Sequence, residues 1–252
     1  MTERKGRYGA LTHERNVRSM AAVFTLLGYC CWPLLLPATP VVHGFVRAVS
    51  DYVYRAYSKS ADAPTLQGQV ALTLPAGLHA GLAASLVDFG GAGFEANPYL
   101  GLTRALSRDW RLDWVLAGYW FNRAVFGQGS AHFEPTMTLS FRDLARLRLG
   151  AAIEPYGASA STPYAEVGGS YPMTDVTTIA STFGYEHGRA VTGYDVAYWN
   201  LGVTHYVNPH CAVDLRYHDA KSIGAERPTL LHQALETTAI GARVVVSLSV
   251  GF

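Results

Sequence analysis

Residues 243–252, which read RVVVSLSVGF, decide the fold. The even-numbered positions of this stretch are all apolar, and the odd-numbered positions are polar or small except for Val245. Side chains on a β-strand alternate between its two faces. A period of two therefore predicts a strand with one continuous apolar face.

This strand resembles the last strand of bacterial outer-membrane β-barrels, which ends in an aromatic residue such as Phe252. The resemblance implies two partners: outer-membrane lipid around the apolar face, and the barrel assembly machinery, which reads the terminal Phe. The abundant Gly and Tyr, 25 and 15 residues, are typical of such barrels. A formal net charge of +1 argues against a nucleic-acid partner.

The N-terminal region has the pattern of a secretory signal. Basic residues from Arg4 to Arg18 precede an uncharged, largely apolar segment at 20–43. We predict a signal peptide over 1–44, with cleavage between 44 and 48, and export to the bacterial outer membrane. A transmembrane anchor is the alternative, although prolines shorten the apolar run below the ~20 residues that a spanning helix needs. The mature chain would keep only Cys211, so no internal disulfide is expected.

Short turn signals recur near 76, 108, 143, 174 and 209, and looser Gly- and Ser-rich connections lie between them. This asymmetry is typical of outer-membrane barrels, whose periplasmic turns are short and extracellular loops longer. The breaks delimit twelve predicted strands, at 45–57, 65–74, 78–88, 94–106, 110–122, 131–141, 145–156, 163–171, 176–186, 194–207, 211–219 and 241–252.

The predicted fold is therefore an all-β, transmembrane, antiparallel up-and-down β-barrel that forms a single domain over 45–252. Closure pairs every strand edge, as a membrane requires. An even strand count places both termini of the barrel domain on the periplasmic side. In the strand at 110–122, Trp110 and Trp120 share the outward face and are candidates for the two aromatic girdles. A soluble lipocalin-like barrel or sandwich is the alternative and would turn the apolar rows inward.

The opening of the mature chain resembles the TorF-like porin family of proteobacterial outer membranes. The family motif S-D-Y-V-x-R stands here at residues 50–55, and the similarity runs from about 45 to 252. Ala56 departs from the family, which commonly has Gly after the Arg. The resemblance implies a channel and no established substrate.

Charged residues on the inward rows are candidates for lining the pore. They are Arg55, Glu95, Arg111, Asp113, Arg123, Glu134, Arg146, Arg148, Glu154, Glu166, Glu186, Asp214, Arg216 and Arg243. Tyrosines accompany them at 57, 99, 119, 156, 198 and 206. The glutamates fall near the outer mouth with arginines at similar height, so we predict an acidic arc facing a basic arc across a narrow pore. The alternative is that these charges pair with one another and plug the barrel.

We predict that residues 220–240 form a long last extracellular loop with helical character, which could be a lid, a constriction or an exposed loop.

The predicted function is passive diffusion of small polar solutes through this lumen. No cofactor or metal site is expected, because the histidines show no paired spacing. No enzyme activity is expected either, because outward His205 and outward Ser181 should lie well apart. A closed structural or adhesion barrel and, less favoured, an outer-membrane lipid hydrolase are the alternatives.

Overall fold

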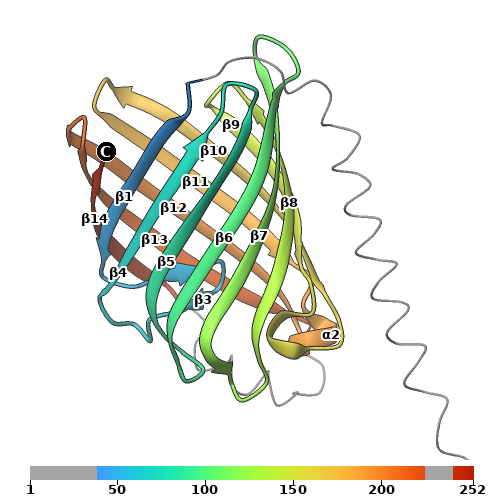
Figure 1. Ribbon diagram of the computed structural model, residues 1–252. Helices are drawn as coiled ribbons and strands as arrows, with labels where there is room; N and C mark the ends of the chain where they lie inside the picture. The colour runs from blue at the N-terminus through green and yellow to red at the C-terminus, as the bar shows by residue number, and fades with distance from the viewer. Residues whose placement is uncertain (1–38, 225–240) are drawn as a thin grey trace, which may run out of the picture. The chain divides into compact units, whose positions relative to one another are not determined.

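The computed structural model describes residues 39–224 and 241–252, and these form a closed antiparallel barrel (Figure 1). Twelve strands make the wall, each paired with its neighbours along the chain, and β1 closes the ring against β14. They are β1 (Val41–Val49), β4 (Thr65–Thr73), β5 (Leu78–Phe89), β6 (Ala92–Ala105), β7 (Trp110–Val125), β8 (Gly129–Phe141), β9 (Ala145–Ala152), β10 (Thr162–Thr174), β11 (Thr177–Glu186), β12 (Asp195–Asn208), β13 (Cys211–Ile223) and β14 (Arg243–Gly251). The predicted fold class is confirmed.

The outer surface of the barrel is apolar because each strand turns one row of its alternating side chains outward. In β14 the outward residues include Val244, Val246 and Leu248, each about half exposed or more. Trp110 is exposed at the start of β7, and Trp120 is exposed on the same face ten residues further along the strand, as expected for two girdles. Among the described residues no helix is both long enough and apolar enough to cross a membrane.

The two ends of the barrel differ in their connections. At the top of Figure 1, the end that holds the C-terminus, all the connections are short turns, whereas at the other end only β5–β6 and β7–β8 are joined by turns as short. At the other end the connections include a 3₁₀ turn, η1 (Pro155–Gly157), and a short helix, α2 (Arg189–Thr192). By the rule for outer-membrane barrels, the first end corresponds to the periplasmic side and the second to the extracellular side. The last loop falls mostly on 225–240, outside the described residues.

The first predicted strand, 45–57, is wrong at its second half. β1 ends at Val49, and the chain then turns into the barrel interior, where β2 (Val53–Tyr54) and β3 (Tyr57–Ser58) pair only with each other. The physical reason is that the apolar outward row of β1, which includes Val42 and Val46, stops at Ala48. The next residues of that row are Ser50, Tyr52 and Tyr54, which suit a lumen better than a lipid boundary.

The ends of two other predicted strands shift by four residues. β9 ends at Ala152 and not at 156, so Glu154 lies in a loop with a left-handed φ of 46° and an exposed side chain. β13 runs to Ile223, four residues into the predicted last loop.

β1 begins at Val41, earlier than the predicted domain start. Its residues pair in register with β4 from Val41 to Val49. Gly44 also exchanges two backbone hydrogen bonds with Phe252, at 3.1 and 3.0 Å. Cleavage within the predicted range would therefore remove Gly44 from the seam that closes the barrel, together with the first residues of β1.

Candidate functional site

The connection between β1 and β4, residues 50–64, forms the candidate site together with the barrel wall. We call it the inward segment. In the ring of twelve strands β9 stands diametrically opposite β1. The inward segment leaves β1 and contacts β8 and β11, which flank that opposite side, so it crosses the full diameter of the lumen.

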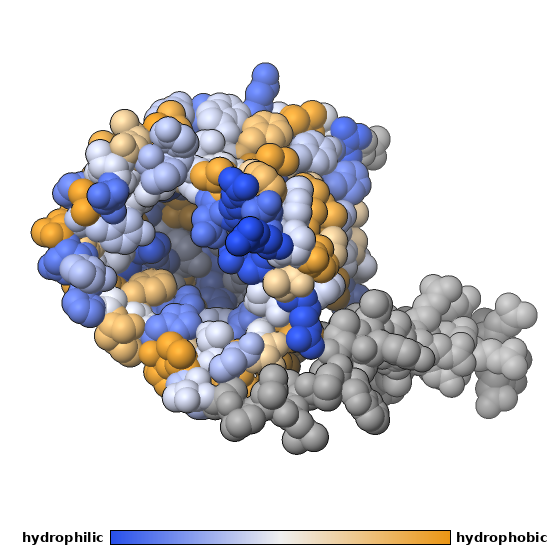
Figure 2. All heavy atoms as spheres, turned by 90° about the horizontal axis from the view of Figure 1, so that it is seen from above, coloured by the Kyte–Doolittle hydropathy of each residue, from blue (hydrophilic) through white to orange (hydrophobic). Residues whose placement is uncertain are grey.

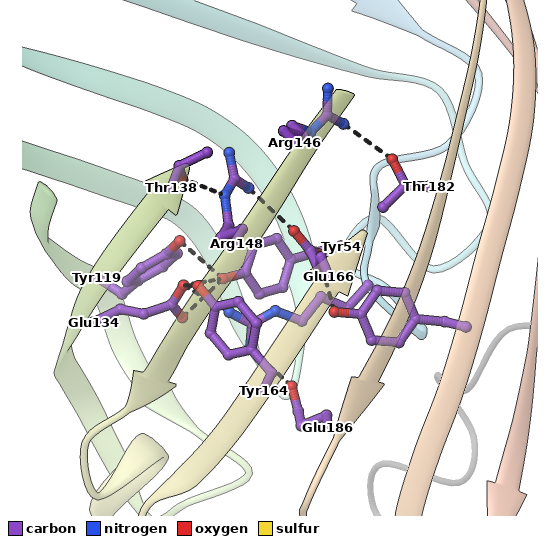
Figure 3. A network of polar contacts seen from close by, with 12 residues as sticks. Tyr54, Tyr119, Glu134, Thr138, Arg146, Arg148, Tyr164, Glu166, Thr182 and Glu186 are labelled. Atoms are coloured by element: carbon purple, nitrogen blue, oxygen red, sulfur yellow. Dashed lines mark hydrogen bonds and ion pairs between the residues drawn. The ribbon is translucent and has the colours of Figure 1, made fainter. Parts of the chain in front are cut away.

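Arg55 stands at the tip of the β2–β3 hairpin, in a left-handed conformation with φ of 55°. Its guanidinium pairs with two carboxylates of the far wall, Glu134 at 2.6 Å and Glu186 at 2.8 Å. It also lies 3.5 Å from the centre of the Tyr164 ring, a close cation–π contact. Figure 3 shows Glu134 and Glu186 on either side of Tyr164. The side chains of Arg55 and Glu134 are only 8% and 4% exposed, so this ion pair is almost dry.

The charge on Arg55 is secure despite its burial. Burial alone would lower the pKa of the guanidinium, but the facing oxygens of Tyr54, Glu134 and Glu186 outweigh it and raise the pKa well above its usual value. Arg55 is therefore a permanent cation in the middle of the lumen.

Tyrosine hydroxyls complete the shell around Glu134. Tyr164 donates to this carboxylate at 2.7 Å and Tyr54 at 2.9 Å. Tyr54 also shares a hydrogen bond of 2.9 Å with Tyr119. With Arg55, the carboxylate thus has three donors, which satisfies its buried oxygens.

Lys59 is the second cation of the inward segment and is 1% exposed. Its ammonium pairs with the fully buried Glu95 of β6 at 2.7 Å. Five aromatic rings surround the ammonium at 4.1 to 6.0 Å, namely those of Tyr52, Tyr54, Phe89, Tyr119 and Phe121. The lysine therefore occupies an aromatic cage with one carboxylate at its wall.

Asp51 anchors the base of the inward segment. It accepts hydrogen bonds from Ser58 at 2.6 Å and from Ser60 at 3.0 Å, within the segment. It also pairs with Arg243 of β14 at 2.6 Å. Arg243 contacts Asp62 as well, so one wall arginine holds both ends of the segment.

Glycines of the wall let the lumen tyrosines lie flat. Tyr164 pairs directly across strands with Gly150, and Tyr198 with Gly184. A side chain at either glycine would overlap the tyrosine ring. The rings therefore rest on bare backbone, which aims the Tyr164 hydroxyl at Glu134 and the Tyr198 hydroxyl at Glu166.

An apolar cluster seals the extracellular half of the barrel around the inward segment. Ala56 and Tyr57 of the segment pack with wall residues that are almost completely buried, including Phe89, Phe121 and Val125. Tyr156 of the η1 loop covers this cluster and lies against Phe89 and Phe121. At this height side chains, and not solvent, fill the lumen.

The periplasmic half of the lumen is hollow. Figure 2 looks into the barrel from above and shows a recess in which polar residues predominate. A cavity of about 330 Å³ lies on the periplasmic side of the inward segment and is lined among others by Arg47, Asp214 and Arg216. Arg216 pairs with Asp214 at 2.9 Å. Elsewhere on the lumen wall, Arg148 pairs with Glu166 at 3.3 Å (Figure 3).

The structure sorts the charged candidates into three groups. The inward segment contributes or contacts five of them, Arg55, Glu95, Glu134, Glu186 and Arg243. The wall of the wider lumen carries six, Asp113, Arg146, Arg148, Glu166, Asp214 and Arg216. The remaining three, Arg111, Arg123 and Glu154, are exposed near the barrel ends. Arg55 does not lie on the wall, so the predicted basic arc does not form, and at the outer mouth the charges pair as in the alternative.

Sequence reasoning missed Lys59, Tyr54 and Asp51. The signal that could have found them is the loss of aliphatic residues from the outward row after Ala48, where Ser50, Tyr52 and Tyr54 follow. A row without aliphatic residues does not suit a lipid boundary.

The arrangement for lipid hydrolysis is not assembled around His205. Outward His205 pairs with Thr177, whereas Ser181 pairs with Leu201, four residues along the strand. At about 3.4 Å per residue, the serine lies roughly 13 Å from the histidine position. Within 39–224 and 241–252 no group of three or more His, Cys, Asp or Glu side chains is arranged to hold a metal ion.

Two solved structures with a similar fold are porins of low sequence identity to this chain. The KdgM porin has a TM-score of 0.54 at 8% identity, over 84% of this chain and 99% of its own. The NanC porin has a TM-score of 0.54 at 9% identity, over 83% of this chain and 98% of its own. These likenesses establish the fold. The sequence has no significant match among curated proteins.

One family profile covers most of the chain, including the whole barrel. It matches residues 37–252 and is described as "Bacterial protein of unknown function (Gcw_chp)". This description does not confirm the TorF-like resemblance, which stays a prediction. The chain belongs to the Gcw_chp family of bacterial proteins.

Proposed function

We propose that this protein is an outer-membrane channel for passive diffusion of small polar solutes, closed in its outer half by the inward segment. One observation carries the proposal. A closed barrel with an apolar exterior surrounds a polar lumen that is hollow at one end, and within the described part of the chain the inward segment alone crosses it. An inert anchor does not require a charged cavity on one side of a segment that crosses the lumen.

The lining of the lumen supports polar solutes. Arg146, Arg148 and Arg216 face the wider half with Glu166 and Asp214, so an apolar solute would have to displace their hydration. We propose these five residues as the pore lining there, in place of the two opposed arcs. The likeness in fold to the KdgM and NanC porins supports a channel in the bacterial outer membrane. Export by an N-terminal signal and assembly through Phe252 stay predictions.

Conductance in planar bilayers tests the proposal. We compare the protein with a variant in which residues 51–63 are replaced by a Gly-Ser linker of equal length. The channel proposal expects the variant to conduct steadily and the protein itself to conduct less or only in brief openings. Absence of current from the folded variant would overturn the proposal and leave a closed structural or adhesion barrel. Heat-modifiable mobility of both proteins on a denaturing gel is the control for folding.

A further inference from the structure

Three buried glutamates in the outer half of the lumen each pair with a cation of the inward segment. They are Glu95, Glu134 and Glu186, and they come from three separate wall strands. The wall thus supplies the carboxylates and the segment supplies the positive charge. A buried carboxylate without a counter-charge is strongly unfavourable. When the inward segment leaves, these carboxylates lose their counter-charges and are open to another cation in the lumen.

The shape of the wall defines which cation fits. Around Arg55 the wall offers two carboxylates and the face of Tyr164, which suits a planar guanidinium. Around Lys59 the wall offers Glu95 with the rings of Phe89, Tyr119 and Phe121. That is an aromatic cage open to an ammonium group.

A second observation points to a ligand larger than these two side chains. His132 of β8 is 7% exposed, and its Nδ1 atom has no hydrogen-bond partner among the residues that the structure describes. Its ring is stacked on Tyr119 at 4.8 Å and lines a small cavity with Arg55 and Glu134. A buried ring nitrogen without a partner is uncommon in a folded protein. It stands where a further polar group of a bound solute would lie.

From these features we propose that the outer half of the lumen is a binding site for organic cations that carry a guanidinium or ammonium group. Arg55 and Lys59 occupy this site as an internal ligand, and a cationic solute displaces them. The inference rests on the proposed channel for its role in transport, but binding itself does not require conduction.

The test uses binding of small cations to the folded protein in detergent. The double variant Arg55→Ala, Lys59→Ala empties both subsites while keeping the wall intact. By calorimetry we expect it to bind methylguanidinium and methylammonium on the order of 30-fold more tightly than the unaltered protein, whose own cations compete at high effective concentration. Neutral methylurea should not bind.

Two further proteins make the result specific. Adding Glu95→Gln, Glu134→Gln and Glu186→Gln to the double variant should abolish binding. Arg142→Ala, which removes an exposed arginine paired with Asp109, should bind like the unaltered protein. The proposal is overturned if the folded double variant binds neither cation, or if binding survives loss of the three carboxylates.

A second measurement on the unaltered protein covers the case in which the double variant does not fold. Methylguanidinium at millimolar concentration should increase tryptic cleavage after Arg55 and Lys59, compared with sodium chloride at equal ionic strength. Equal cleavage in the two salts would contradict the proposal. If methylguanidinium does not change the cleavage but the Gly-Ser linker variant conducts, only the cation site is rejected. If the double variant binds the cations but the linker variant does not conduct, only the channel is rejected.

Discussion

Glu134→Gln and Glu186→Gln should loosen the inward segment from the barrel wall. Each substitution keeps the size of the side chain and removes one of the two charges that face Arg55. The amide oxygen that Glu134→Gln introduces would still accept hydrogen bonds from Tyr54 and Tyr164, so the packing around it should persist. Any effect then reports the lost charge and not a cavity.

The magnitude follows from the burial of the pair. A hydrogen bond to a charged group contributes about 1.5–3 kcal/mol. We therefore expect each single substitution to destabilise the docked segment by about 2 kcal/mol, a roughly 30-fold shift toward the undocked state. With both carboxylates neutral, Arg55 is a buried charge without a partner. Breaking such a pair costs about 3–5 kcal/mol, which corresponds to a shift of about 150-fold or more.

Limited trypsin digestion measures this shift, because the segment contains two trypsin sites. The side chains of Arg55 and Lys59 are 8% and 1% exposed, so the docked segment should resist cleavage. When docking is fast relative to cleavage, the cleavage rate follows the undocked population. Mass spectrometry of the fragments separates these two cuts from cuts elsewhere. Glu154→Gln is the matched control, because Glu154 is exposed in the η1 loop.

The reasoning is refuted if the folded double glutamine variant is cleaved in the segment no faster than the Glu154→Gln control. That result would mean that apolar packing alone holds the segment in place. Equal acceleration by the single and double substitutions would show instead that the two carboxylates do not act together on Arg55.

Three further predictions concern the barrel itself. Leu215→Arg, on the outward row of β13, should lower the free energy of unfolding in liposomes by about 2–4 kcal/mol, measured by urea titration. Ala83→Arg, which faces the lumen cavity, should lower it by about 1 kcal/mol or less. Gly184→Val should displace the Tyr198 ring and cost about 1–3 kcal/mol in the same assay, with Tyr198→Ala largely relieving the clash. N-terminal sequencing of the exported protein should find cleavage before Val41, because later cleavage would remove part of β1; a start at 45 or 49 would contradict this.

The barrel was predictable because its wall obeys a single local rule. A strand between lipid and lumen must alternate, and the alternation in residues 243–252 sets the outward row that β14 displays. The same rule placed Glu134, Glu166 and Glu186 on the inward face, where the structure has them. Turn chemistry then located the short connections to within a few residues.

The inward segment was not predictable by that rule, because its partners are distant in the chain. Arg55 meets residues 79 and 131 positions away, which no periodicity relates to it. The motif at 50–55 has residue types that a strand also tolerates, so it extended the first predicted strand past Val49. Only the closed barrel shows that the chain crosses the lumen, which brings Arg55 and Lys59 to their carboxylate partners on the wall.

The chemistry of the inward segment bears on whether it is fixed or movable. Replacing a buried ion pair by well-packed apolar residues is often neutral or stabilising, so ionic contacts are an inefficient way to build a permanent plug. The segment already packs Ala56 and Tyr57 into an apolar cluster, and more of the same would have sealed the barrel. Instead, Arg55 and Lys59 carry full charges into matched carboxylate sites. Such contacts can be exchanged for another cation at little net cost, whereas an apolar contact can only be lost. The charges are therefore better explained by a segment that docks and releases than by one that only fills space.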